Sequence, residues 1–186
     1  IDIGKVHSRL VEGLPQLNHA ASQLEALSIL MVLRETELIL QNSAVLKIAA
    51  SSLLQFKSGY SLVLAAIREK NVSALNTLAG GLAEDELIRM LVDHVLFVET
   101  LKPSAALLLF DICSKFLSPA GISTIFKKIV FQWASPNFAR IRSPNSQKML
   151  SNLISQLLGR VNVNEEDVIM AVNKGITCRF EYFKEE

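Results

Sequence analysis

Residues 24–33, with the sequence LEALSILMVL, decide the fold class of this chain. Apolar side chains occupy nearly every face of a helix drawn through them, which is typical of a helix covered by neighbours on several sides. We therefore expect a long central helix that runs from just after Pro15 to about Gln41.

The rest of the chain repeats apolar residues at spacings of three and four rather than two. Those spacings place side chains on one face of a helix, whereas a half-buried strand needs a spacing of two. With 50% hydrophobic residues but only 8 Gly and 5 Pro, the composition is aliphatic and helix-forming. The sequence therefore predicts an all-α fold of about ten helices without strands. The further helices are expected at residues 42–58, 60–70, 73–82 and 84–101, after Pro103 and after Pro119, and at residues 146–158, 165–172 and 176–182.

Several of the expected helix boundaries carry suitable capping residues. Asn42 and Ser118 can accept hydrogen bonds from the free amides of a first helical turn. The three acids at 84–86 suit the positive end of a helix. Gly59 can end a helix by adopting the left-handed conformation, and the glycine pair at 80–81 is interpreted as another helix stop.

The chain of 186 residues is long enough for a single helical domain over 1–186, and we expect it to be a segment of a longer protein because it starts with Ile. No apolar run approaches the roughly 18 residues of a membrane span, so we expect a soluble domain. Cys113 and Cys178 lie far apart, and neither belongs to a CxxC pair. This argues against a disulfide framework or a zinc site, and it favours buried thiols and an intracellular location, cytoplasmic or nuclear.

Consecutive helices with short connections, each apolar on more than one face, resemble the stacked helix pairs of armadillo and HEAT α-solenoids. Candidate pair starts lie near Gln16, Tyr60, Glu84 and Pro119, at unequal spacings. The resemblance implies an irregular antiparallel helix-pair stack that serves in scaffolding or peptide binding. A compact helical bundle is the alternative architecture, because the sequence has no fixed repeat length.

The sequence contains no recognisable motif for catalysis or metal binding. His7, His19 and His94 lie in separate segments, without a second His or an acid at a metal-ligand spacing. The glycine pair at 80–81 lacks the context of a phosphate-binding loop, and no GxSxG is present. We therefore expect no enzymatic activity, no cofactor and no metal.

Charge is distributed unevenly along the chain, although the net charge is only +1. Residues 112–164 contain seven basic residues and no Asp or Glu, while acids outnumber bases on both sides. Such a basic segment can attract an anionic partner despite the nearly neutral total. Within it we expect residues 134–145 to form an exposed basic loop with Arg140 and Arg142. The loop includes two Ser-Pro pairs, and phosphorylation of those serines would weaken the attraction.

Aromatic residues accompany the bases in this segment. Phe126 and Phe131 fall on the apolar face of an amphipathic helix, so we expect both in the core. Trp133 and Phe138 either contact a partner or only pin the loop to the helices.

Together these features predict a non-catalytic protein–protein interaction module, a segment of a scaffold or assembly factor. Its partner would be another protein, which places a helix or an acidic peptide in an apolar groove between helices while the basic residues steer it there. A nucleic-acid-associated factor that uses residues 112–164 and an architectural oligomerisation domain are the alternatives. No contact with a membrane is expected. The predicted partner-binding residues are Lys127, Lys128, Trp133, Phe138, Arg140, Arg142 and Lys148.

Overall fold

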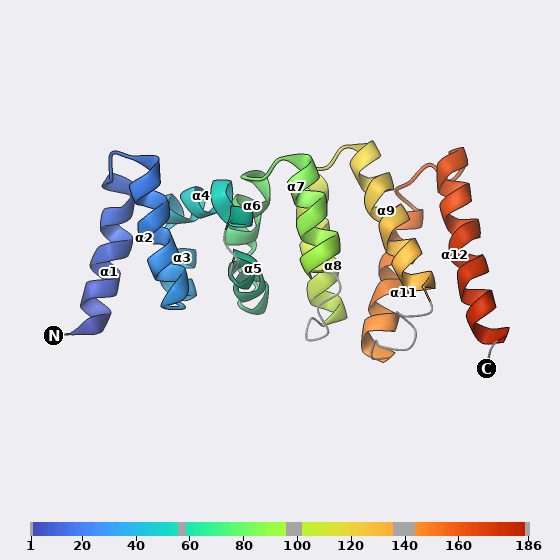
Figure 1. Cartoon of the computed structure of the whole chain (residues 1–186), viewed down its shortest axis with the longest axis horizontal. Coiled ribbons are helices and arrows are strands. Elements are labelled where there is room, and N and C mark those ends of the chain that lie inside the picture. The colour runs from blue at the N-terminus through green and yellow to red at the C-terminus, as the bar shows by residue number, and fades with distance from the viewer. Residues whose placement is uncertain (1, 56–58, 96–101, 136–143, 185–186) are drawn as a thin grey trace. The chain divides into compact units, whose positions relative to one another are not determined.

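The computed structural model describes residues 2–55, 59–95, 102–135 and 144–184. Within these residues the chain forms 11 α-helices, four short 3₁₀ or π-helical segments and no strand (Figure 1). The prediction of an all-α fold of about ten helices is confirmed. Helix packing divides the chain into two compact units, Ile1–Leu87 and Ile88–Glu186. A single domain over 1–186 stays a prediction.

The first unit consists of short helices around an aliphatic core. Its helices are α1 (Ile3–Gly13), α2 (Ala20–Val32), α3 (Thr36–Gln41), α4 (Ser43–Ser52), α5 (Gly59–Arg68) and α6 (Val72–Gly80). Helix α4 packs against α2, α3 and α6, and α5 packs against α3 and α6. Leu27, Leu30, Ile39 and Leu62 are fully buried between these helices. Asn42 caps α4 as predicted, because its side chain accepts hydrogen bonds from the amides of Ala44 and Val45.

The expected long helix from Pro15 to Gln41 is wrong, because the chain turns between α2 and α3. Arg34 adopts the left-handed conformation, with φ 60°. The amide of Arg34 donates to the carbonyl of Met31, and the amide of Glu35 donates to that of Leu30. This pair of hydrogen bonds is a Schellman motif, which ends a helix and usually has glycine at the left-handed position. No glycine marks the turn, so the sequence pattern does not reveal it.

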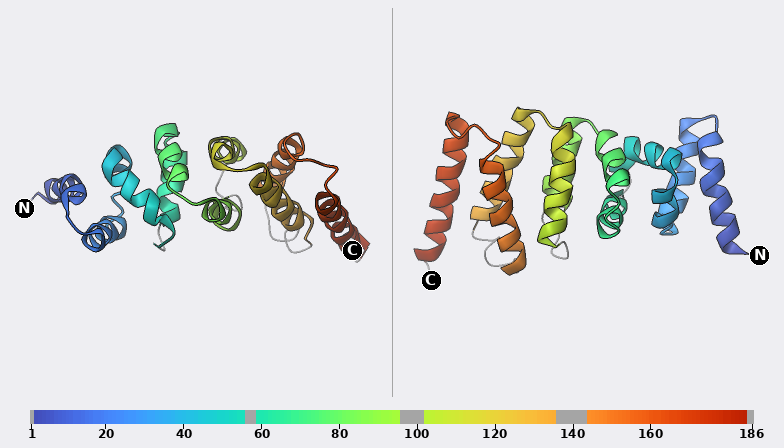
Figure 2. Two further views of the ribbon diagram at one scale, coloured as in Figure 1. Left: turned by 90° about the horizontal axis from the view of Figure 1, so that it is seen from above. Right: turned by 180° about the vertical axis from the view of Figure 1, so that it is seen from behind.

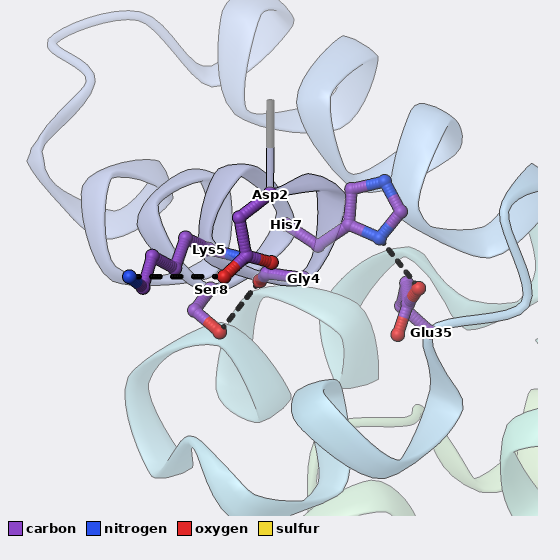
Figure 3. Close-up of polar contacts among 6 residues, drawn as sticks. All are labelled: Asp2, Gly4, Lys5, His7, Ser8 and Glu35. Atoms are coloured by element: carbon purple, nitrogen blue, oxygen red, sulfur yellow. Dashed lines mark hydrogen bonds and ion pairs between the residues drawn. The ribbon is translucent and has the colours of Figure 1, made fainter.

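Helix α1 is also missing from the predicted set. It packs against α2 and α3, and one polar contact adds to this packing. Nδ1 of His7 on α1 lies 2.6 Å from Oε1 of Glu35, the residue that precedes α3 (Figure 3). Asp2 caps the start of α1 by accepting a hydrogen bond from the amide of Lys5. The contact between His7 and Glu35 therefore connects α1 to the turn between α2 and α3.

Two glycines of this unit allow close packing rather than a left-handed turn. Gly59 is the first residue of α5 and its φ is not positive, so the predicted left-handed stop is wrong. A Cβ atom there would lie 2.0 Å from the carbonyl oxygen of Leu53. Helix α6 does end at Gly80, and a Cβ atom on the next residue, Gly81, would lie 2.5 Å from Cβ of Ala50. Any larger residue at either position would collide with the neighbouring helix.

The second unit is arranged around α9. Helix α7 (Glu84–Arg89) contains the boundary between the two units, has the predicted acids in its first turn and continues as a π-helical turn, Met90–Val95. The helices that follow are α8 (Pro103–Cys113), α9 (Pro119–Ala134), α11 (Pro144–Leu158) and α12 (Glu166–Lys184). Helix α9 packs against α11 and α12, and α8 packs against α11. Helices α9 and α12 run in the same direction and α11 runs opposite to both (Figures 1 and 2).

The two helices expected at 165–172 and 176–182 are one continuous helix, α12, which is a correction to the predicted pattern. Gly175 lies inside α12, where a Cβ atom would come within 3.0 Å of Val130 Cγ1 and 3.2 Å of Ala134 Cβ. The glycine therefore lets α12 approach α9 closely and does not interrupt the helix. Ser118 caps α9 as predicted, because its hydroxyl accepts a hydrogen bond from the amide of Gly121.

Candidate partner-binding groove

An open groove of about 550 Å³ lies between α9 and α12 in the second unit. Lys127 and Phe131 line it from α9, and Asp167, Met170 and Lys174 line it from α12. Ala171 and Asn173 complete the wall on the side of α12. Beside the groove, at Gly175, the two helices approach each other closely.

Large apolar side chains of this groove remain exposed. Phe131 is 37% exposed and Met170 is 62% exposed, whereas Phe126 is fully buried. The prediction that Phe126 is a core residue is confirmed, and the same prediction for Phe131 is wrong. Because the two residues are five positions apart, they lie about 140° apart around the helix, so α11 and α12 do not cover both. Exposed aromatic and Met side chains are common at sites that bind protein partners.

Charged side chains flank the apolar part of the groove. Nζ of Lys127 forms an ion pair with Oδ2 of Asp167, which joins α9 to the first turn of α12. Nζ of Lys174 lies 5.4 Å from the centre of the Phe131 ring, within the range of a cation–π interaction. The groove therefore combines apolar surface with two lysines and one carboxylate.

Part of the basic segment is neutralised by the chain's own acids. Besides the pair of Lys127 with Asp167, Arg160 donates to Oδ1 of Asp111 at 2.8 Å and lies over the ring of Phe110. Asp111 and Asp167 flank the acid-free residues 112–164 on either side, and folding brings them back onto the segment. The positive potential is therefore weaker than the sequence alone suggests.

The predicted partner-binding residues do not lie together in one site. Lys127 lines the groove, Lys128 is exposed on α9, and Trp133 is half-buried near the end of the same helix. Lys148 is exposed on α11, and no described carboxylate forms an ion pair with Lys128 or Lys148. The remaining predicted residues, which lie outside the described part of the chain, are Phe138, Arg140 and Arg142.

The predicted basic loop at 134–145 is described only at its two ends. Ala134 is buried as the last residue of α9, and Pro144 is the first residue of α11. Residues 136–143 lie outside the described residues.

Sequence reasoning missed the part of the groove that α12 contributes. Asp167, Met170 and Lys174 recur at spacings of three and four, so they lie on one face of a helix. This spacing could have predicted that the three residues share one face of a helix. It was missed because two separate helices were expected, at 165–172 and 176–182, and because Phe131 was expected to be buried.

The described residues contain no group of three or more His, Cys, Asp or Glu side chains that could hold a metal ion. Cys113 is buried, and burial raises the pKa of its thiol to about 12. The side chain of His94 lies outside the described part of the structure. No helix in the described ranges is both long enough and apolar enough to cross a lipid bilayer.

Comparisons of the chain with protein-family models, with curated proteins and with solved structures found no match.

Proposed function

We propose that this chain is a non-catalytic protein-binding module, and that the groove between α9 and α12 takes an amphipathic helix of a partner protein. The observation that carries the proposal is the pair of exposed apolar side chains, Phe131 and Met170, in a groove flanked by Lys127 and Lys174. Apolar side chains of the partner helix would cover Phe131 and Met170, and an acidic residue of that helix would face Lys174, because Lys127 is already paired with Asp167.

The alternation of helix direction through α9, α11 and α12 supports an armadillo- or HEAT-like stack as the architecture of this module (Figure 1). In such a stack, helices of successive pairs that run in the same direction lie side by side and form extended binding surfaces. The groove lies between two helices of this kind.

The test compares two exposed residues of α12 that differ in their relation to the groove. Met170 lines the groove and is 62% exposed, whereas Ile176 is 53% exposed and is not among its lining residues. Both Met170→Glu and Ile176→Glu replace an exposed apolar side chain by a carboxylate, so neither substitution should unfold the protein. Partners are first captured from a cell extract with the unmodified chain, and the contacting segment is then synthesised as a labelled peptide.

Fluorescence anisotropy should show binding at least about ten-fold weaker for Met170→Glu and unchanged for Ile176→Glu. Equal affinity of the Met170→Glu variant and the unmodified chain would contradict the proposal. Captured material that nuclease treatment removes would instead favour a nucleic-acid partner. A stable dimer in light scattering that Met170→Glu dissociates would favour an oligomerisation domain.

A further inference from the structure

A second pocket, of about 580 Å³, lies in the first unit and plays no part in the proposed protein-binding groove. It is formed where the end of α2, the start of α3 and one face of α5 meet. Arg34 and Arg68 both line it, together with the hydroxyl-bearing residues Thr36 and Ser61. These side chains can all donate hydrogen bonds to an anion.

The arginines of this pocket differ from the paired cations of the second unit. Arg34 and Arg68 are exposed, and neither forms an ion pair with any described acid. The residues that line the pocket include no Asp or Glu. Two guanidinium groups in one pocket without a carboxylate are suited to a doubly charged anion, which each can bind through two parallel hydrogen bonds.

The backbone conformation of Arg34 provides a matched control residue elsewhere in the unit. Arg34 has φ 60°, a conformation that costs a non-glycine residue roughly 1–2 kcal/mol. Lys70 has φ 53° at the equivalent position after α5, but it does not line the pocket. The chain thus has two strained basic residues of the same kind, of which only Arg34 supplies a guanidinium to the pocket.

The apolar walls of the pocket favour an anionic group that is part of a larger ligand over a free ion. Val32 lines the pocket and is 80% exposed, and half-buried Ala65 adds further apolar surface. A free inorganic ion would leave this apolar surface uncovered, whereas an apolar residue beside a phosphorylated one would bury it. No aromatic side chain is among the lining residues, so the pocket offers no platform for stacking a nucleobase.

We propose that the pocket between α2, α3 and α5 binds a phosphorylated serine or threonine of a peptide, with Arg34 and Arg68 on the phosphoryl group and Val32 against the neighbouring apolar residue. The phosphoryl group carries a charge of about −1.5 to −2 at neutral pH and three strong acceptor oxygens.

The test uses the full chain and a capped tripeptide with phosphoserine between two leucines. Its unphosphorylated form, inorganic phosphate and a short thymidine oligonucleotide serve as the other probes, each titrated by calorimetry. The phosphopeptide should bind, and it should bind more tightly than each of the other probes. Arg34→Gly and Arg68→Gln should each weaken phosphopeptide binding at least about ten-fold, since each removes charge-assisted hydrogen bonds.

The matched control is Lys70→Gly, which relieves the same backbone strain and removes the same charge outside the pocket. It should leave phosphopeptide affinity unchanged, and Arg34→Gly should unfold at the same or a higher denaturant concentration than the unmodified chain. The proposal is overturned by a phosphopeptide that binds no better than its unphosphorylated form, or by inorganic phosphate that binds equally well. An oligonucleotide that binds more tightly, or an equal loss of affinity in Lys70→Gly, also overturns it.

Discussion

Arg34 and Lys70 show how single residues end helices in this protein without glycine. At Lys70, as at Arg34, the amide of the left-handed residue and the amide that follows bond back to the preceding helix, here to the carbonyls of Ile67 and Ala66. Asn71, the residue after Lys70, accepts a hydrogen bond from the amide of Ala74 and so starts α6. One short segment therefore ends one helix and caps the next, which fixes the turn despite the unfavourable backbone conformation.

Replacing Lys70 by glycine should stabilise the protein. Glycine adopts a positive φ without steric strain, although it loses more backbone entropy on folding, so the free energy of unfolding should rise by about 0.5–1 kcal/mol. Urea denaturation followed by circular dichroism measures the change. Lys70→Ala is the control, because alanine removes the charge and keeps the strain. Equal stabilities of the two variants would contradict this account of the turn.

The thiol of Cys113 should be unreactive in the folded protein. Burial raises the pKa of this thiol from its ordinary value of 9.0 to about 12, so the folded state resists forming the reactive thiolate. A thiol reagent at pH 8 should modify Cys113 only as fast as the protein unfolds, whereas Cys178, which is half-buried, should react sooner. Peptide mapping by mass spectrometry identifies which cysteine is labelled first, and early labelling of Cys113 would show that this part of α8 opens readily.

The raised pKa of Cys113 makes the free energy of unfolding depend on pH in the alkaline range. Below pH 9 the thiol is protonated in both states, so ionisation of Cys113 has no effect on folding. Between pH 9 and about 12 the unfolded state loses the proton first, so the free energy of unfolding should fall as pH rises. Cys113→Ala should remove this part of the decline in a pH series of urea denaturations. A decline of the same steepness in that variant would assign it to other groups.

At the scale of elements, the contact between α9 and α12 decides the architecture of the second unit. Gly175 allows the two helices to approach, and the ion pair of Lys127 with Asp167 joins them across the edge of the groove. Val168 and Ala171 are buried on the inner face of α12, while Met170 on its flank stays exposed. The same contact therefore packs the unit and forms the candidate binding groove.

A large side chain at position 175 should force the two helices apart. Gly175→Leu places a branched side chain where even a Cβ atom would lie 3.0 Å from Val130, and overpacking of this kind costs about 1–3 kcal/mol. Thr177→Leu, on the exposed face of the same helix, should change the free energy of unfolding by no more than about 0.5 kcal/mol. Urea denaturation compares the two variants, and equal stabilities would refute the role assigned to Gly175.

At the scale of the whole molecule, the described basic side chains of the second unit fall into paired and unpaired groups. Lys127 and Arg160 are paired with Asp167 and Asp111, so they contribute little net attraction. Lys128 is exposed on α9 without a described ion-pair partner, as Lys148 is on α11. Unpaired charges of this kind accelerate the approach of an acidic partner, and salt screens them.

Reversing both unpaired charges should slow association with the partner of the groove. The double variant Lys128→Glu, Lys148→Glu should lower the association rate constant several-fold at low salt and reduce its dependence on ionic strength. Stopped-flow fluorescence measures the rates. The double variant Lys47→Glu, Lys70→Glu makes the same change in net charge on the first unit and is the control. If both variants slow association equally, attraction depends on total charge and not on the basic segment.

The sequence by itself determined the all-α class, most helix positions and the caps at Asn42 and Ser118, because helix formation depends on neighbours three and four residues apart. Only the tertiary structure decided the turn at Arg34, the continuity of α12 through Gly175 and the exposure of Phe131. It also decided that Asp167 neutralises Lys127, a residue 40 positions away. These features depend on which helices pack together and how closely, and the spacing of residues along the chain does not determine either.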